Sequence, residues 1–170
     1  MTPGANLRMA LIAAVIFICD QATKWSVLRF LNQNNERVVI DGFFKFVHWG
    51  NTGAAWSLFK DKNHYLAIVS LVALLALFLW RHHFDTHTRT GQLALGLIFG
   101  GILGNLYDRL FREHVIDFIR FYLYRRGSGD EIGFPAFNIA DSAICIGVGL
   151  LFLLSWRQSD SGGVRSEAAR

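Results

Sequence analysis

Four long apolar segments limit what this chain can fold into. A helix that crosses the hydrocarbon core of a bilayer needs about 20 consecutive apolar residues. Segments of this kind lie at 9–31, 65–80, 93–107 and 134–156, the middle two being slightly short without flanking residues. Hydrophobic residues make up 52% of the chain and charged residues only 18%, against about 25% charged in a soluble domain. The sequence therefore predicts a single-domain α-helical integral membrane protein with four transmembrane helices, at about 9–31, 64–81, 92–109 and 136–156.

The two ends of the chain differ in character. No small-x-small cleavage site follows the first segment, so we expect a retained helix rather than a cleaved signal peptide. Residues 157–170 are polar, and we expect a disordered tail there. Cys19 and Cys145 lie inside apolar segments and predict neither a disulfide framework nor a zinc site. The net charge of +4, spread over loops, fits lipid headgroups rather than nucleic acid.

Four crossings place both termini and the short connection 81–92 on one side of the membrane. The long loops, 32–63 and 110–135, then share the other side with the helix ends that border them. An intramembrane charge costs at least about 2.5–3.5 kcal/mol, so polar residues near these ends are candidates for function. The residues concerned are Asp20, Asn51, Asn105, Asp108, Arg109, Asp117, Asn138 and Asp141. Lys and Arg number six on the terminus side and nine on the long-loop side, so charge counting does not establish the orientation.

Both long loops have the pattern of β-structure. An Asp41-Gly42 turn between two apolar stretches predicts a hairpin. Residues 114–124 are rich in β-branched and aromatic side chains and predict a strand. A turn at 126–130 could return the chain as a further strand at 132–137. We expect these strands to form a small sheet on the membrane surface.

Gly96, Gly100 and Gly104 recur every four residues in the third apolar segment, with Gly101 beside them. This small-xxx-small spacing favours close helix packing over a chemical role.

Asp117 and Asp141 are the candidate catalytic pair. Two neighbouring carboxyl groups do not both ionise easily, so one holds a proton while the other acts as a base. Peptide hydrolysis needs both functions, one to activate water and one to protonate the leaving amine.

Structural interpretations of the same residues remain open. Asn138 could cap the fourth helix with Asp141 in its first turn, and Asp117 could be a solvated strand residue. Asp20 and Lys24 have the spacing of an intrahelical ion pair. Asp108 and Arg109 could form an ion pair at a helix end.

Other kinds of site have weaker support. His82, His83 and His87 fall in the short loop, where a solvated basic segment is the simpler interpretation. Glu113-His114 lacks the second histidine of a zinc protease, and Ser57 and Ser142 have no placed histidine partner. We expect no metal and no other cofactor.

Five ordered blocks between residues 16 and 150 resemble the lipoprotein signal peptidases (signal peptidase II, aspartic peptidase family A8). They are Asp20-Gln21-x-x-Lys24, Asn51-Thr52-Gly53-Ala54-Ala55, Gly100-Gly101-x-x-Gly104-Asn105-x-x-Asp108-Arg109, Val115-Ile116-Asp117-Phe118 and Phe134-Pro135-Ala136-Phe137-Asn138-Ile139-Ala140-Asp141-Ser142.

This resemblance implies four transmembrane helices with an extracytoplasmic β-cradle, in the bacterial inner membrane and with both termini cytoplasmic. It implies an aspartic endopeptidase that cuts diacylglyceryl-modified prolipoproteins just before the lipid-bearing cysteine. By position, Asp117 and Asp141 would be catalytic. Residues that would bind substrate or support the site are Asp20, Asn51, Gly53, Asn105, Asp108, Arg109, Asn138 and Ala140. Membrane lipid and inhibitory cyclic lipopeptides of the globomycin type are further expected partners, and the chain is expected to be a monomer.

One segment departs from the family pattern. The turn Arg125 to Glu131 is longer than expected, and we interpret it as a surface insertion. Two rival functions are compatible with the sequence. A proton-coupled transporter would need carboxylates reachable from both membrane faces, and a non-enzymatic scaffold would tolerate Asp117→Asn.

Overall fold

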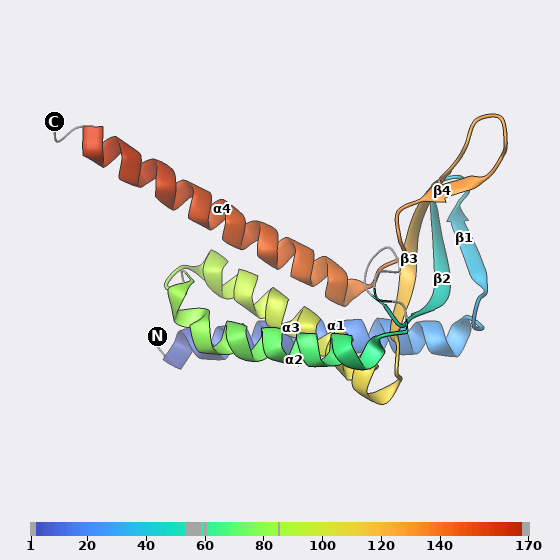
Figure 1. The fold of residues 1–170 in the computed structure, drawn as a ribbon, viewed down its shortest axis with the longest axis horizontal. Coiled ribbons are helices and arrows are strands. Elements are labelled where there is room, and N and C mark those ends of the chain that lie inside the picture. Colours follow the sequence, from blue (N-terminus) through green and yellow to red (C-terminus); the bar gives the residue numbers. More distant parts are fainter. Residues whose placement is uncertain (1–2, 54–58, 60, 85, 168–170) are drawn as a thin grey trace.

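The computed structural model describes residues 3–53, 59, 61–84 and 86–167. Four helices dominate it: α1 (Pro3–Phe30), α2 (Asn63–Trp80), α3 (Arg89–Phe111) and α4 (Ile139–Glu167). A short 3-10 helix, η2 (Arg81–His83), follows α2. Each of the four long helices is long and apolar enough to cross a membrane. Both termini lie at the end opposite the sheet, in agreement with four crossings (Figure 1).

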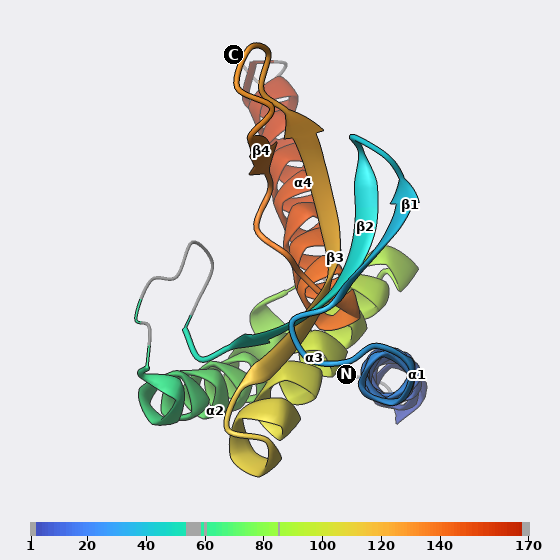
Figure 2. The ribbon, with the colours of Figure 1, turned by 90° about the vertical axis from the view of Figure 1, so that its right-hand side faces the viewer.

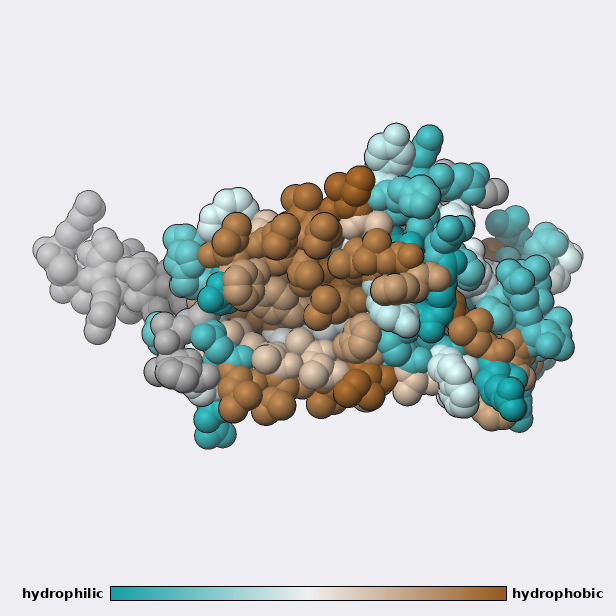
Figure 3. Space-filling view, turned by 90° about the horizontal axis from the view of Figure 1, so that it is seen from below, coloured by the Kyte–Doolittle hydropathy of each residue, from teal (hydrophilic) through white to brown (hydrophobic). Residues whose placement is uncertain are grey.

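Helix α3 is the centre of the helical part. In its apolar window 56% of residues are buried, against 11–17% in the other three helices. It packs against α1, α2 and α4, whose outward faces expose Leu, Val, Ile and Phe side chains. Figure 3 shows these side chains as a broad apolar surface, bordered by hydrophilic residues where the sheet begins. Such a surface suits contact with lipid.

The glycines of α3 allow two helices to approach it closely. A Cβ added to Gly96 would lie 2.7 Å from the Cβ of Ile12, and one at Gly104 would lie 2.5 Å from Oδ2 of Asp20. A Cβ at Gly101 would meet the carbonyl oxygen of Ala140 in α4 at 2.5 Å. The predicted packing role is therefore confirmed, with Gly101 serving a second interface.

The long loops form one antiparallel sheet in the order β1 (Glu36–Ile40), β2 (Phe44–Asn51), β3 (Val115–Tyr124) and β4 (Glu131–Gly133). The predicted hairpin is confirmed, with Gly42 in its turn at φ +70°. Figure 2 faces the sheet end and shows β3 running from the end of α3 to the edge beside β4. The strands run across the helix axes, so the sheet lies along the expected membrane surface (Figure 1).

The last strand is shorter than predicted. β4 covers three residues rather than 132–137. Beyond it, the N–H of Phe134 donates to the carbonyl of Phe121 at 3.0 Å, and an isolated bridge joins Ile119 and Phe137. Pro135 lies in the interruption and has no N–H to donate to a ladder. Pro135 therefore prevents a continuous strand up to α4.

Helix boundaries also differ from the prediction. α1 and α3 begin earlier than expected, and Thr88 caps α3 by accepting a hydrogen bond from the N–H of Gly91 at 3.0 Å. α4 begins at Ile139 instead of 136, because Asn138 is its cap, and it continues to Glu167 instead of ending at Trp156. The apolar part of α4 still ends at Arg157, so the predicted span and the observed helix agree only over the membrane portion.

The long turn at 125–131 projects from the far end of the sheet (Figure 1). Its residues are exposed, and the N–H of Arg125 donates to the carbonyl of Asp130 at 2.8 Å. At its base, Glu131 accepts from Nζ of Lys45 at 2.7 Å, and Lys45 also donates to Glu36 at 2.6 Å. Lys45 thus ties β1 and β4 to β2, which anchors the turn to the sheet.

Candidate active site

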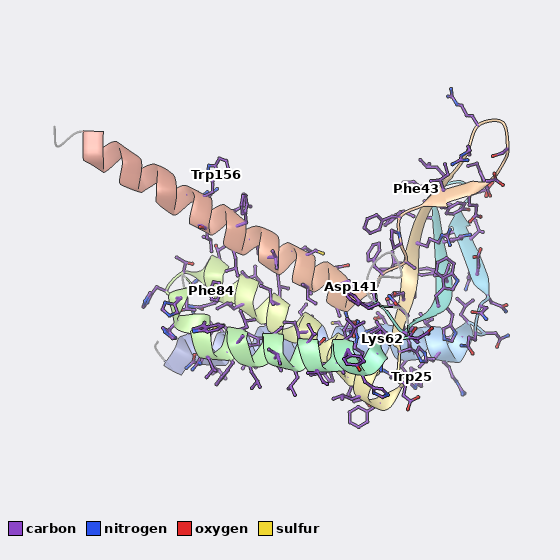
Figure 4. The ribbon with its side chains drawn as sticks, viewed as in Figure 1. Trp25, Phe43, Lys62, Phe84, Asp141 and Trp156 are labelled. Atoms are coloured by element: carbon purple, nitrogen blue, oxygen red, sulfur yellow. The ribbon has the colours of Figure 1, made fainter. Side chains whose placement is uncertain are left out.

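The polar residues collect where the start of α4, the end of α3 and the inner end of the sheet meet. Asp141 lies in the first turn of α4, at the sheet end of the helix (Figure 4). Asp117 is in β3, opposite Trp49 of β2, and Asn51 is the last residue of β2. Topology predicted this convergence, and the hydrogen bonds described below confirm it.

Asp117 is held by two side-chain amides. Its Oδ2 accepts from Nδ2 of Asn51 at 3.0 Å, and its Oδ1 accepts from Nδ2 of Asn138 at 2.9 Å. The N–H of Gly53 donates to Oδ1 of Asn51 at 2.9 Å, which turns the amide nitrogen of Asn51 towards Asp117. Asp117 is only 4% exposed, so the interpretation as a solvated strand residue is wrong.

Asp141 caps the start of α4 with one carboxyl oxygen and faces Asn105 with the other. Its Oδ2 accepts from the N–H of Asn138 at 3.2 Å, while its own N–H donates to Oδ1 of Asn138 at 2.9 Å. This reciprocal pair is a capping box, so the predicted cap is confirmed. The other oxygen of Asp141 accepts from Nδ2 of Asn105 at 2.7 Å. Capping thus fixes the carboxyl group without using all its acceptor capacity.

Asn138 links the two aspartates directly. Its Oδ1 caps Asp141, and its Nδ2 donates to Asp117 and also lies 3.2 Å from Oδ1 of Asn105. The residue is fully buried. Asn138 therefore donates to both carboxyl groups, from its side chain to Asp117 and from its backbone N–H to Asp141.

The electrostatic environment couples the two acids. Burial of the carboxyl group, followed by the negative charge of Asp141, raises the pKa of Asp117 to about 7. Hydrogen bonds from Asn51 and Asn138 and the positive charge of Lys24 act in the opposite direction. A carboxyl group with this pKa exchanges its proton near neutral pH, which suits a general acid or base.

Arg109 borders the pair but does not form the expected ion pair with Asp108. Asp108 pairs with Lys24 at 2.8 Å and with Arg112. Arg109 instead donates from Nη2 to the carbonyl of Gly53 at 3.4 Å, and its buried Nε has no hydrogen-bond partner. Its charge interacts with both Asp117 and Asp141. Arg109 is thus a cation at the edge of the candidate pair.

The remaining candidates form a layer behind the pair. Asp20 and Asp108 are fully buried, and neither is hydrogen-bonded to the carboxyl groups of Asp117 or Asp141. Ala140 is fully buried against Gly104. Ala54, Ala55 and Ser57 lie outside the described residues. Over the part of the chain that the structure describes, no group of three or more His, Cys, Asp or Glu side chains could hold a metal ion.

Sequence reasoning left two residues of this inner layer, Gln21 and Lys24, out of the candidate set. The expected pair of Lys24 with Asp20 is confirmed at 2.7 Å, but Lys24 also reaches α3. The i,i+4 spacing was the available signal, and it could not reveal partners more than 80 positions away.

Four apolar helices with two neighbouring aspartates at one end, Asp117 buried and Asp141 half-buried, define a membrane-embedded hydrolase of the aspartic peptidase class. Comparisons with known proteins agree. Residues 12–157 match the family model described as Signal peptidase (SPase) II. The lipoprotein signal peptidase of Anoxybacillus flavithermus is 31% identical over 159 residues, covering 94% of this chain and 91% of that protein. That of Bacillus pumilus is 35% identical over 143 residues, covering 84% and 88%.

The fold has a solved counterpart as well. A bacterial membrane enzyme determined in meso at 2.3 Å superposes with a TM-score of 0.77 at 31% identity, covering 90% of each chain. A second, at 1.9 Å, gives 0.71 at 33% identity, covering 86% of this chain and 90% of the other. The chain belongs to the signal peptidase II family, the lipoprotein signal peptidases, and its activity is the removal of signal peptides from prolipoproteins.

Proposed function

We propose that Asp117 and Asp141 are the catalytic pair of this peptidase. The observation that carries the proposal is the bridge through Asn138, which contacts both carboxyl groups. The raised pKa of Asp117 supports a shared proton. The other polar side chains at the site are amides and Arg109, which are suited to bind and orient rather than to exchange protons near neutral pH.

The ionised carboxylate takes a proton from a water molecule, which attacks the carbonyl carbon of the scissile bond. The protonated carboxyl group donates a hydrogen bond to the carbonyl oxygen and later transfers its proton to the leaving nitrogen. Each turnover returns one proton to the pair, so the starting state is regenerated. Arg109 and Asn51 are placed to hydrogen-bond the substrate backbone, and the unpartnered Nε of Arg109 has a free donor for this purpose.

We propose further that the substrate carries a diacylglyceryl-modified cysteine and is cut just before it. Exposed aromatic side chains support a lipid-facing sheet. The ring of Phe43 is tilted against that of Phe121, 5.3 Å between centroids, and the exposed ring of Phe134 lies 5.9 Å from that of half-buried Phe137. Phe43, Phe121, Ile132 and Phe134 contribute to a cavity of about 330 Å³. Figure 4 shows Phe43 on the sheet, beyond the level of Asp141.

The orientation of the chain and its other partners belong to the same proposal. A signal peptide directs its protein out of the cytoplasm, so the cutting site must face the outer side of the inner membrane. This places the sheet in the periplasm and both termini in the cytoplasm. Cyclic lipopeptides of the globomycin type would compete for the same site. The chain is also expected to act as a monomer.

The test is cleavage of a purified lipid-modified prolipoprotein in detergent, with a chelator present. Asp117→Asn and Asp141→Asn should each lower kcat by roughly 100- to 10,000-fold or more, as expected for loss of a general acid or base. Asp130→Asn changes an exposed carboxylate on the same side of the membrane and should retain full activity. Cleavage by folded Asp117→Asn, loss of wild-type activity to the chelator, or trapping by a serine-directed reagent would each contradict the mechanism.

A further inference from the structure

A fully buried ion cluster lies behind the catalytic pair. Lys24, Asp20 and Asp108 each have no solvent-exposed surface. Nζ of Lys24 lies 2.7 Å from Oδ2 of Asp20, 2.8 Å from Oδ2 of Asp108 and 3.0 Å from Oδ1 of Asn105. An ammonium group has three N–H donors, and here three acceptors surround it, one from α1 and two from α3.

Each carboxylate of the cluster also holds the backbone beside one catalytic aspartate. Oδ1 of Asp20 accepts from the N–H of Ala140 at 3.0 Å, and Ala140 directly precedes Asp141. Oδ2 of Asp108 accepts from the N–H of Ile116 at 3.3 Å, and Ile116 directly precedes Asp117. The two catalytic residues are therefore attached, through their neighbours, to carboxylates that share one lysine.

Asn105 provides a third connection. Because Lys24 can only donate, it holds Oδ1 of Asn105 towards itself, and the amide nitrogen must then point away from it. That nitrogen donates to Oδ1 of Asp141 at 2.7 Å. Lys24 thus determines which end of the Asn105 amide meets the catalytic carboxyl group.

We propose that Lys24 is a positioning residue that sets the relative placement of Asp117 and Asp141 through Asp20, Asp108 and Asn105. The inference rests on the proposed catalytic pair. Lys24 is hydrogen-bonded to neither carboxyl group of that pair. It acts through Asn105, which donates to Asp141, and through Asp20 and Asp108, which hold the N–H groups of Ala140 and Ile116.

Stability alone is a weak explanation for this cluster. Buried ion pairs often contribute less than well-packed apolar side chains, since desolvation offsets much of their attraction. The helices also leave room for the cluster, because α3 has no side chain at Gly104. A Cβ added there would lie 2.5 Å from Oδ2 of Asp20. A compact ammonium group can meet three convergent acceptors, which the planar fork of an arginine cannot do in the same space.

The test compares Lys24→Met with a matched control, Arg112→Gln. Arg112 pairs with the same Asp108 through its other oxygen, and it is half-buried at the edge of the cluster. Both variants remove one positive charge. Only Lys24→Met removes the donor that holds Asn105 and the ammonium group that Asp20 and Asp108 share. Per folded enzyme, Lys24→Met should lower kcat on the order of 10- to 100-fold, as loss of supporting contacts does at other sites, with KM within about threefold. Arg112→Gln should stay within about threefold of wild type in both constants.

A pH profile separates positioning from general destabilisation. Asp117 faces Asp141 from α4, Lys24 from α1 and Arg109 from α3, besides the amides of Asn51 and Asn138. Since the charge of Lys24 lowers the pKa of Asp117, its removal should move the alkaline limb of kcat/KM, where the pair loses its last proton, to higher pH. A purely structural loss would scale the activity equally at every pH.

A second variant covers the case in which Lys24→Met does not fold. Lys24→Met combined with Asp20→Asn removes one charge of each sign, and the new amide can still accept from the N–H of Ala140. It should fold, as measured by its melting temperature in detergent, and still show the lower kcat.

Asp117→Asn, assayed in parallel, separates the two proposals. If Asp117→Asn cleaves, the catalytic pair itself is wrong. If Asp117→Asn is silent while the lysine variants keep wild-type kcat and pH profile, or match Arg112→Gln in both, the positioning role alone is overturned.

Discussion

At the scale of single residues, Asp117 lowers the stability of the folded state besides its proposed function. A carboxyl group whose pKa is raised in the folded state binds its proton more tightly there than in the unfolded chain. Folding is therefore favoured below the unfolded pKa, near 3.8, and the folded state loses stability as the pH rises towards 7. At about 1.4 kcal/mol per pKa unit, ionisation of Asp117 costs the folded state up to roughly 4 kcal/mol.

Asp117→Asn should therefore change the pH dependence of stability while it abolishes cleavage. Removing the ionisable group removes the loss between pH 4 and pH 7, so the melting temperature of the variant relative to wild type should rise with pH over this range. The amide also places an NH₂ group against one donor, from Asn51 or Asn138, which lowers stability equally at all pH values.

Melting curves in detergent at pH 5, 6, 7 and 8 provide the measurement, with Asp130→Asn as the exposed control. A difference between Asp117→Asn and wild type that stays constant across this range would mean that Asp117 titrates as an ordinary carboxyl group.

At the scale of elements, the contact between α1 and α3 determines where the inner layer of charges can form. Gly96, Gly100 and Gly104 remove side chains from the face of α3 that meets α1. Asp20 can then lie against the backbone of α3 and reach the start of α4 through the N–H of Ala140. The close packing of α1 against α3 is consequently what allows Asp20 to hold the start of α4.

Gly104→Ala should disturb both the packing of α1 against α3 and the geometry of the site. Its Cβ would lie 2.5 Å from Oδ2 of Asp20, and that oxygen is also bound to Lys24. We expect a lower melting temperature, with a cost of about 1–3 kcal/mol for overpacking, together with reduced kcat.

Gly149→Ala is the matched control, because a Cβ at this position in α4 meets nothing within 4 Å. It should leave cleavage and melting temperature close to wild type. Equal behaviour of the two alanine variants would show that the close approach at Gly104 is unimportant.

At the scale of the whole molecule, the sheet and both aspartates lie at one end and the chain termini at the other (Figure 1). Asp20, Asp108, Asp117 and Asp141 are all at the sheet end, in one connected set of contacts. A proton-coupled transporter would need carboxylates towards both faces. This arrangement favours the peptidase and makes the orientation testable.

The orientation can be tested by labelling in a background carrying Cys19→Ala and Cys145→Ala. Ser128→Cys, in the exposed turn of the sheet, should react with a membrane-impermeant maleimide in intact spheroplasts. His87→Cys, in the exposed connection at the terminus end, should react only after the membrane is opened. The reverse pattern would place the sheet in the cytoplasm and contradict the proposed topology.

Four helices and their order followed from the sequence, because a bilayer leaves the backbone no hydrogen-bond partners except its own. The hairpin at Asp41-Gly42 and the cap at Asn138 followed from local turn and capping chemistry. The proposed catalytic pair came from ordered motifs that resemble a known family. Each of these properties is determined within a short stretch of chain or by a residue pattern.

Only the tertiary structure decided the partners of the buried charges. Asp108 binds Lys24 and Arg112 rather than its neighbour Arg109, and Asp20 binds the N–H of Ala140, 120 positions away. These contacts depend on how closely α1 and α4 approach α3, which is the sum of many packing contacts. The sequence therefore determined which residues could do the chemistry, and helix packing decided which of them hold the two aspartates in place.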